Sequence, residues 1–519
     1  MDIIRSSGIL LHPTSLPGPD GIGDLGPEAF RWLDFLSETG CQMWQILPLG
    51  PTGYGDSPYQ CFSAFAGNPF LISPAMLFNE GLLTKYDLAD RPDFPTDFVD
   101  YGPVIIWKNT ILDRAYANFT NTSDKKLIDE FSAFKTKNIT WLADFAIFMA
   151  IKEQNNYVAW DLWPENLRKR KPKALAAFNK NHQIDIEKHM FRQFLFFRQW
   201  QEVKSYAEKL EIKIIGDVPF VIAFDSADVW ANPELFYLDQ ERLPTVVAGV
   251  PPDYFSSTGQ LWGNPLYRWD IHKNTGYQWW LDRIQAVLQM VDVVRIDHFR
   301  GFEAYWEVPF GSLTAETGRW VKGPGQDFFK AVKEKLGNLP IIAEDLGLIT
   351  DEVVKLREAF DLPGMKILQF AFSDGPDDDF LPHNYPVNCF AYTGTHDNNT
   401  TRGWYNSAAD YEKDFCRHYL ARSGEDIAWS MIRALWQSVA CNVIAPMQDL
   451  LNLDGEARMN LPGTPSGNWT WRMTPFAINS GLKKRLYETN FLYGRLPKST
   501  KNKLRESLDI QTAGRIKPH

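Results

Sequence analysis

Short runs of consecutive apolar, β-prone residues recur along the chain, and each run closes in polar residues, glycine or proline. Continuous apolar positions are typical of strands buried on both faces, as in a parallel sheet covered by helices. Eight runs fit this description, at residues 8–12, 43–48, 213–219, 291–297, 340–345, 365–370, 389–396 and 442–449. Eight strands separated by helix-length segments predict an α/β fold, a (β/α)8 TIM barrel.

Two gaps between the runs are much longer than one crossover helix requires. Residues from about 70 to 211 carry charged and aromatic residues in a helical pattern, which predicts an inserted helical subdomain. Residues from about 224 to 277 carry proline and glycine clusters, and a long irregular segment of this kind is usually functional. We therefore expect a single catalytic barrel domain over 1–519, in which the second insertion carries a lid loop at 249–264.

The composition indicates a folded globular protein, because 44% of the 519 residues are hydrophobic and 23% are charged. The 54 basic and 64 acidic residues give a net charge of −10, which would repel nucleic acid. No apolar stretch is long enough for a membrane span, and the first residues lack a signal-peptide pattern. Five scattered cysteines argue against a disulfide framework and favour a cytoplasmic location. Neither nucleic acid nor a membrane is an expected partner.

Carboxylates at the ends of the buried runs are the candidate catalytic residues, since a buried charge needs a partner or a function to offset its desolvation. Arg295 and Asp297 lie two residues apart and hence on one face of a strand. A neighbouring guanidinium keeps a carboxylate ionised, as a nucleophile requires. A buried ion pair that only braces the barrel would have the same spacing.

Two further runs end in carboxylates. Glu344 and Asp345 are adjacent, so only one of them can face inward. Glu344, which has the longer side chain, is the candidate general acid, because an apolar barrel mouth would raise its pKa. Asp345 is expected to be a cap or a supporting partner. Asp397 adds a third carboxylate beside His396, a residue that alone is more often structural.

Convergence of three carboxylates at strand ends implies glycoside chemistry. Two carboxyls about 5–5.5 Å apart make a retaining mechanism, and a third would bind sugar hydroxyls more strongly in the transition state. The chain has no GxGxxG after a strand, no GxxxxGKS or GxxxxGKT, no HExxH and no clustered His/Cys spacing. Nucleotide, nicotinamide and zinc enzymes are thus disfavoured, and we expect no cofactor and no metal.

The candidate residues lie in motifs that run nearly from end to end of the chain. The motifs are GILLHPTSLP at 8–17, GYGDSPY at 53–59, GDVP at 216–219, RIDHFRG at 295–301, AEDLG at 343–347, GTHDN at 394–398, ARMNLPG at 457–463 and NWTWR at 468–472. Together they resemble the 4-α-glucanotransferases (amylomaltases or disproportionating enzymes) of glycoside hydrolase family 77, in the α-amylase-like clan. One departure from the wider amylase pattern is HFR at 298–300, which lacks the Lys-His of many relatives.

The resemblance implies roles for individual residues. Asp297 would be the nucleophile, Glu344 the general acid/base and Asp397 the transition-state stabiliser. Tyr254, Phe255 and Trp262 lie in the stretch that matches a loop over the cleft, and we expect them to form a lid, with ordinary loop packing as the alternative. The substrate-binding residues implied in all are Tyr59, Asp217, Arg295, His396, Tyr254, Phe255 and Trp262.

The implied activity is transfer of a segment of an α-1,4-glucan to the 4-hydroxyl of another glucan or of glucose. Maltooligosaccharides would be substrates, and the resemblance implies a monomer without a cofactor. A retaining α-glucan hydrolase on the same barrel is the close alternative. The third possibility is a non-catalytic glucan-binding protein with degenerate carboxylates, against which the intact Asp297, Glu344 and Asp397 argue.

Overall fold

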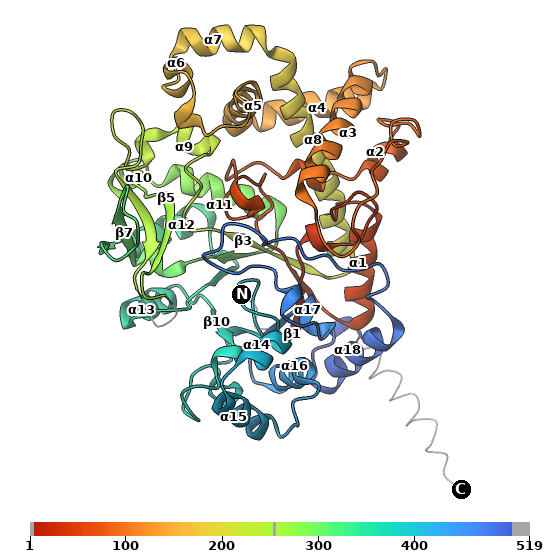
Figure 1. Cartoon of the computed structure of the whole chain (residues 1–519), viewed down its shortest axis with the longest axis vertical. Helices are drawn as coiled ribbons and strands as arrows, with labels where there is room; N and C mark the ends of the chain where they lie inside the picture. Colours follow the sequence, from red (N-terminus) through yellow and green to blue (C-terminus); the bar gives the residue numbers. More distant parts are fainter. Residues whose placement is uncertain (1–4, 253–255, 501–519) are drawn as a thin grey trace.

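Eight parallel strands form the central sheet of the computed structural model, which describes residues 5–252 and 256–500 (Figure 1). Their order in the sheet is β10-β11-β12-β1-β2-β3-β6-β9. The strands are β1 (Ser6–Leu10), β2 (Met43–Gln45), β3 (Lys213–Val218), β6 (Val293–Ile296), β9 (Ile341–Ala343), β10 (Gly364–Ile367), β11 (Cys389–Tyr392) and β12 (Asn442–Pro446). Each strand overlaps one of the eight apolar runs, and the predicted α/β barrel is confirmed.

The two edge strands, β9 and β10, nearly close the sheet into a barrel. The Ala343 N–H donates to the Pro363 carbonyl at 2.9 Å. The Met365 N–H donates to the Asp345 carboxylate at 2.7 Å. Backbone donors at this seam are therefore satisfied although the two strands form no regular ladder.

Successive side chains of a strand point to opposite faces, so alternate residues face either the barrel interior or the surrounding helices. Ile215 and Val293 belong to the apolar cluster inside the barrel. Ile214 and Val294 belong to the larger cluster that includes the surrounding helices. The same alternation turns Arg295 inward, toward the end of the barrel formed by the C-termini of the strands, here called the barrel mouth.

Helices surround the barrel between and after its strands. They are α1 (Pro27–Thr39), α8 (Gln183–Lys209), α11 (Gln278–Met290), α12 (Gly325–Leu336), α13 (Asp351–Ala359), α14 (Thr401–Ser407), α15 (Asp410–Leu420), α16 (Ile427–Gln437), α17 (Met447–Leu450) and α18 (Ser480–Leu492). Within residues 5–252 and 256–500, every helix is too short or too polar to span a bilayer.

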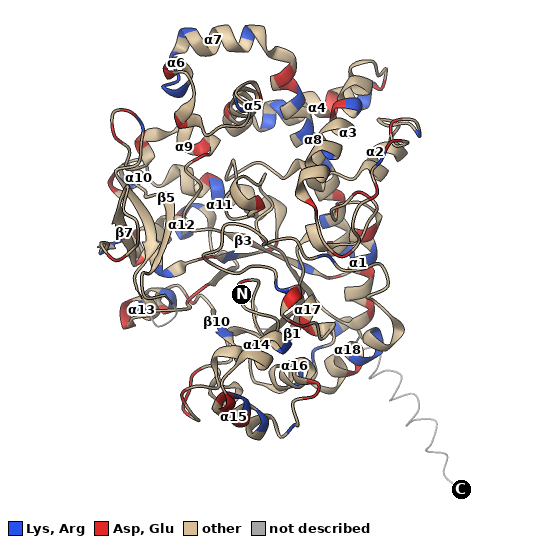
Figure 2. Cartoon of the chain, viewed as in Figure 1, with Lys and Arg blue, Asp and Glu red and all other residues tan. Residues whose placement is uncertain are grey.

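The long segment between β2 and β3 is mostly helical before it reaches α8. Its helices are α2 (Pro74–Asn79), α3 (Tyr101–Thr120), α4 (Lys125–Lys137), α5 (Ile139–Gln154), α6 (Glu165–Arg168) and α7 (Pro172–Asn181). They lie together at the top of the view in Figure 1. Both basic and acidic residues occur along these helices (Figure 2).

A second, antiparallel sheet lies beside the mouth and corrects one expectation. Residues 224–277, expected to be irregular, contain α9 (Ala227–Ala231), β4 (Val246–Val250), β5 (Gln260–Pro265) and α10 (Trp269–Asn274). After β6 follow β7 (Ala304–Pro309) and β8 (Arg319–Lys322), and the sheet order is β5-β4-β7-β8. The glycines and prolines were misleading because Gly249 and Gly263 lie within the strands, and Pro251, Pro252 and Gly259 lie in the connection between β4 and β5.

Candidate active site

An arginine between two carboxylates forms the centre of the barrel mouth. Arg295 on β6 donates to Asp217 on the neighbouring strand β3 at 2.5 Å, and these two side chains are 3% and 1% exposed. Its other terminal nitrogen lies 3.0 Å from an oxygen of Asp297, which directly follows β6. Although burial opposes its charge, the two carboxylates raise the pKa of Arg295 well above the usual value. The cation therefore stays charged and orients both acids.

Asp297 is the partly exposed member of this group. Burial raises its pKa, the Arg295 charge opposes that rise, and the Asp217 charge adds to it. The predicted pairing of Arg295 with Asp297 is present in the structure. The same guanidinium also bonds to Asp217, so Arg295 links the two carboxylates.

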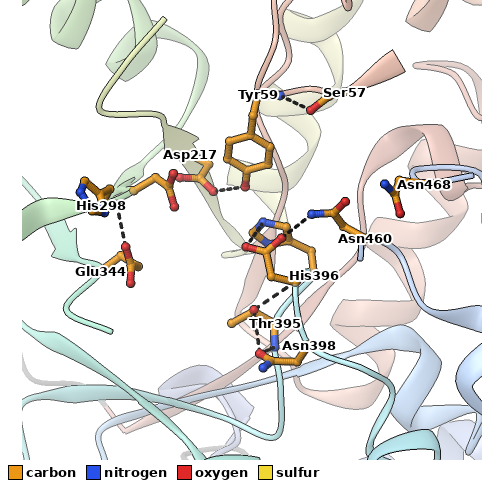
Figure 3. Close-up of polar contacts among 12 residues, drawn as sticks. Ser57, Tyr59, Asp217, His298, Glu344, Thr395, His396, Asn398, Asn460 and Asn468 are labelled. Atoms are coloured by element: carbon orange, nitrogen blue, oxygen red, sulfur yellow. Dashed lines mark hydrogen bonds and ion pairs between the residues drawn. The ribbon is translucent and has the colours of Figure 1, made fainter. Parts of the chain in front are cut away.

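Glu344 directly follows β9 and lies next to His298 (Figure 3). Its two carboxyl oxygens accept the backbone N–H groups of His298 at 2.6 Å and Leu346 at 2.9 Å. Burial raises the pKa of Glu344, and the Asp297 charge raises it further. The rise is larger than that for Asp297, so Glu344 keeps its proton when Asp297 has lost one.

Backbone geometry around Glu344 explains its position. His298 has the left-handed conformation (φ 51°), which is uncommon for a residue other than glycine. In that conformation its N–H meets the Glu344 carboxyl. Asp345 points elsewhere, where it accepts the Met365 N–H and pairs with Arg357 at 3.1 Å.

Asp397 occupies a different electrostatic environment, on the loop after β11. The amide of Asn460 donates to one of its oxygens at 2.6 Å, and Nε2 of His396 lies 3.3 Å from the other. Although burial alone would raise it, His396 and Asn460 hold the pKa of Asp397 well below its usual range. Asp397 therefore loses its proton at a much lower pH than Glu344 does, and at neutral pH Asp397 is ionised while Glu344 is protonated.

Tyr59 connects the two sides of the mouth. Its hydroxyl donates to Asp217 at 2.6 Å (Figure 3). Its ring stacks on His396, with centroids 5.1 Å apart and planes 12° apart, and contacts Trp469 at 5.8 Å. Burial and the Asp217 charge raise the pKa of Tyr59, so the hydroxyl remains a donor.

The segment 457–472 supplies residues that our interpretation of the sequence missed. Asn460 holds Asp397, Trp469 packs on Tyr59 and His396, and Arg458 donates to the Asp397 carbonyl. The signal was present in the ARMNLPG and NWTWR motifs, to which no role was assigned. These motifs lie in turns and loops, where no periodicity indicates which side chain faces the site.

Of the three expected lid residues, Trp262 on β5 lies at the site. Its ring meets the His298 ring edge to face, with centroids 4.9 Å apart. Burial lowers the pKa of His298 to about 3, so this contact is between two neutral rings. Tyr254 and Phe255, at the connection between β4 and β5, lie outside the described residues.

The mouth thus combines the protonated carboxyl of Glu344, the ionised carboxylates of Asp297 and Asp397, and the ion pair of Arg295 with Asp217, in a site lined by aromatic rings. This set can attack an acetal carbon, protonate its leaving oxygen and stabilise positive charge between the two. In the described part of the chain, no group of three or more His, Cys, Asp or Glu residues is arranged to hold a metal ion.

Comparisons with known proteins agree with one another. A family model described as 4-alpha-glucanotransferase matches residues 11–478. A 4-alpha-glucanotransferase of Thermus thermophilus is 52% identical over 494 residues, which cover 94% of this chain and 98% of the relative. One from Synechocystis is 51% identical over 495 residues, with 95% and 98% covered. The solved amylomaltase from Streptococcus agalactiae in complex with acarbose is similar at a TM-score of 0.92 and 42% identity, over 95% of this chain and 100% of that chain.

Proposed function

The chain belongs to the 4-alpha-glucanotransferase family, and on that premise we propose how its mouth transfers glucan by retaining double displacement. The enzyme is a 4-alpha-glucanotransferase. Its proposed donors are α-1,4-glucans and maltooligosaccharides, and the acceptor is the 4-hydroxyl of another glucan or of glucose. The observation that carries the mechanism is Arg295, which holds Asp297 ionised opposite the protonated Glu344.

In the first step the Asp297 carboxylate attacks the anomeric carbon of the donor. The bond from that carbon to the leaving oxygen breaks, and the Glu344 proton moves to this oxygen. The donor fragment leaves with a free 4-hydroxyl, and its other part remains as an ester on Asp297. Positive charge develops on the sugar ring as the bonds change, and the ionised Asp397 stabilises it.

The second step reverses the first with a new sugar. Glu344, now a carboxylate, takes the proton of the acceptor 4-hydroxyl, whose oxygen attacks the anomeric carbon and displaces Asp297. Asp217, Arg295, Tyr59 and His396 are proposed to hold the transferred glucose through both steps. Their mutual contacts fix their positions before substrate arrives, which lowers the cost of orienting it.

Transfer requires that a sugar hydroxyl react in place of water. Trp262 beside His298 offers a flat apolar surface on which an acceptor sugar can stack, and it excludes water from the ester. We therefore propose Trp262 as an acceptor contact, and Tyr254 and Phe255 as further lid residues that remain predictions.

Incubation with maltotriose alone tests this function, with products separated by chain length. A glucanotransferase yields chains longer than the substrate together with shorter ones. A hydrolase on the same barrel yields only shorter products and new reducing ends, and that result would contradict the proposal. No product at all would favour a glucan-binding protein. The Asp297→Ala protein, prepared identically, controls for contaminating amylases.

A further inference from the structure

The loop that carries His396 and Asp397 is tied at both ends to a single carboxylate. Asp449, in α17 immediately after β12, is 1% exposed. Its Oδ2 accepts the Thr393 hydroxyl, at the start of the loop, at 2.5 Å. At the end of the loop the Thr401 N–H donates to Oδ1 and the Thr401 hydroxyl donates to Oδ2, both at 2.7 Å.

The direction of these hydrogen bonds requires an acceptor at position 449. The amide nitrogen of Gln369, which can only donate, lies 3.3 Å from the Thr401 hydroxyl oxygen and 3.0 Å from the Asn399 carbonyl. The Thr401 hydroxyl therefore accepts from Gln369 and must give its own hydrogen to Asp449. A carboxylate accepts all three donors, whereas an amide would place its NH2 group against at least one of them.

Asp449 has only neutral hydrogen-bond donors: burial raises its pKa, and the bonds from Thr393 and Thr401 oppose that rise. Among the described residues it has no Lys, Arg or His ion-pair partner. A buried carboxylate without a cation is costly unless several hydrogen bonds stabilise it. A carboxylate of this kind is expected to hold a functional loop in place rather than to increase the stability of the fold.

The loop itself has an internally bonded turn that does not fix its own orientation. Both the Thr395 N–H and the Thr395 hydroxyl lie within bonding distance of the Asn398 side-chain oxygen, at 2.8 and 2.9 Å. These bonds keep the shape of the turn but leave its angle to the barrel open. Contacts at its base fix that angle together with contacts farther along the loop, where Asn460 and Arg458 donate to Asp397 and Tyr59 stacks on His396.

We propose that Asp449 is a positioning residue that clamps residues 393–401 at their base and so fixes His396 and Asp397 relative to Asp297. The inference rests on the proposed function, since it presumes that Asp397 acts on the transition state. Displacement of a catalytic group by about 1 Å can lower a rate about 100-fold. The loss should fall on kcat, because interactions that strengthen in the transition state act there rather than on KM.

The test compares Thr393→Val, which removes one donor at equal volume, with Thr393→Ser, which keeps it. In maltotriose disproportionation we expect Thr393→Val to lower kcat about tenfold with KM within about twofold, and Thr393→Ser to restore it. Asp449→Asn should lower kcat about 100-fold. Thr39→Val is the matched control, since the hydroxyl of the buried Thr39 donates to the Phe35 and Leu36 carbonyls within α1.

Several results would overturn the clamp. They are a kcat of Thr393→Val equal to that of the wild type, an equal loss in Thr393→Ser or Thr39→Val, or a change confined to KM. If Asp449→Asn does not fold, the two Thr393 variants still decide the question. Failure of the wild-type protein to lengthen maltotriose would refute the proposed function instead, so the two failures are distinguishable.

Discussion

Two buried arginines at opposite ends of the barrel show how one residue type serves chemistry or stability. Arg295 at the mouth faces two carboxylates, Asp217 and Asp297. Arg495 lies at the other end, the barrel floor, where the strands begin, and is fully buried. It donates to backbone carbonyls that include those of Ser6, Trp436, Ala440 and Cys441.

Their partners give the two guanidinium groups opposite electrostatics. Burial lowers the pKa of Arg495 to about 9, since its carbonyl partners are neutral and Arg5 lies nearby. At the mouth the carboxylates outweigh burial, and the pKa of Arg295 rises. At the floor, backbone carbonyls accept the hydrogen bonds of Arg495, and these bonds join β1 to the C-terminal segment. At the mouth, Arg295 instead pairs with carboxylates in a position open to substrate. Changes at the mouth should therefore affect activity, and changes at the floor should affect stability.

The largest effect is expected for the mouth variant Asp297→Ala. Loss of the nucleophile should lower kcat at least about 10⁴-fold, while thermal stability stays similar or rises because a partly buried charge is removed. Initial rates on maltotriose and a melting curve measure both. The control is Asp292→Ala on the floor side of β6, where Asp292 accepts the Ile214 N–H and activity should persist. Retained activity in Asp297→Ala would overturn our catalytic assignment.

Glu344→Gln should have the next largest effect, about 10³-fold on maltotriose, because the leaving oxygen loses its proton donor. Formation of the ester from an α-glucosyl fluoride, which needs no protonation to leave, should be largely spared. In the wild type the raised pKa of Glu344 keeps the acid protonated to higher pH. The alkaline decrease of kcat/KM should therefore begin at a higher pH than it would with a glutamate of ordinary pKa. An equal loss on both donors would refute the acid role. Asp345→Asn is the control.

At the floor, Arg495→Gln should destabilise the protein without altering its chemistry. Several carbonyls would lose their donor, and we expect the free energy of unfolding to fall by about 4 kcal/mol. Urea unfolding measures the loss, and kcat per folded molecule should not change. Arg31→Gln on the exposed face of α1 is the control, because a surface ion pair contributes little. A lower kcat at unchanged stability would break the distinction between the two ends.

The smallest effect is expected at the rim of the mouth. Trp262→Ala should raise the ratio of hydrolysis to transfer about threefold, since water then competes better for the ester. Free glucose and chain-lengthened products from maltotriose give this ratio. Trp320→Ala, on strand β8 of the same sheet, provides a comparison at a Trp that packs on Arg300 instead. An unchanged ratio in Trp262→Ala would remove this residue from the lid.

The barrel could be predicted because each of its strands has a recognisable apolar pattern within a few consecutive residues. Apolar residues fill both faces of eight short runs, and the polar residues that end several of these runs mark the mouth. Asp297 and Glu344 were found in this way. The antiparallel sheet was missed because β8 is largely exposed and has no apolar pattern, and because turns dominate the sequence around β4 and β5.

The remainder of the site depends on contacts between distant segments. Asn460 reaches Asp397 from 63 positions away in the chain, and Asp449 reaches Thr393 from 56 positions away. Neither contact can be predicted from the spacing of residues within one helix or strand. The left-handed backbone of His298 and the bond from its N–H to Glu344 likewise leave no trace in a hydrophobic pattern.

Trapping of the glucosyl ester tests the central claim most directly. The Glu344→Gln protein, treated with an α-glucosyl fluoride, should form the ester and lack the base that releases it. Proteolysis and peptide mass spectrometry then locate the added sugar. Our account predicts one hexose on the peptide that contains Asp297. A hexose on the peptide of Asp397 or Asp217, or turnover without any covalent species, would contradict it.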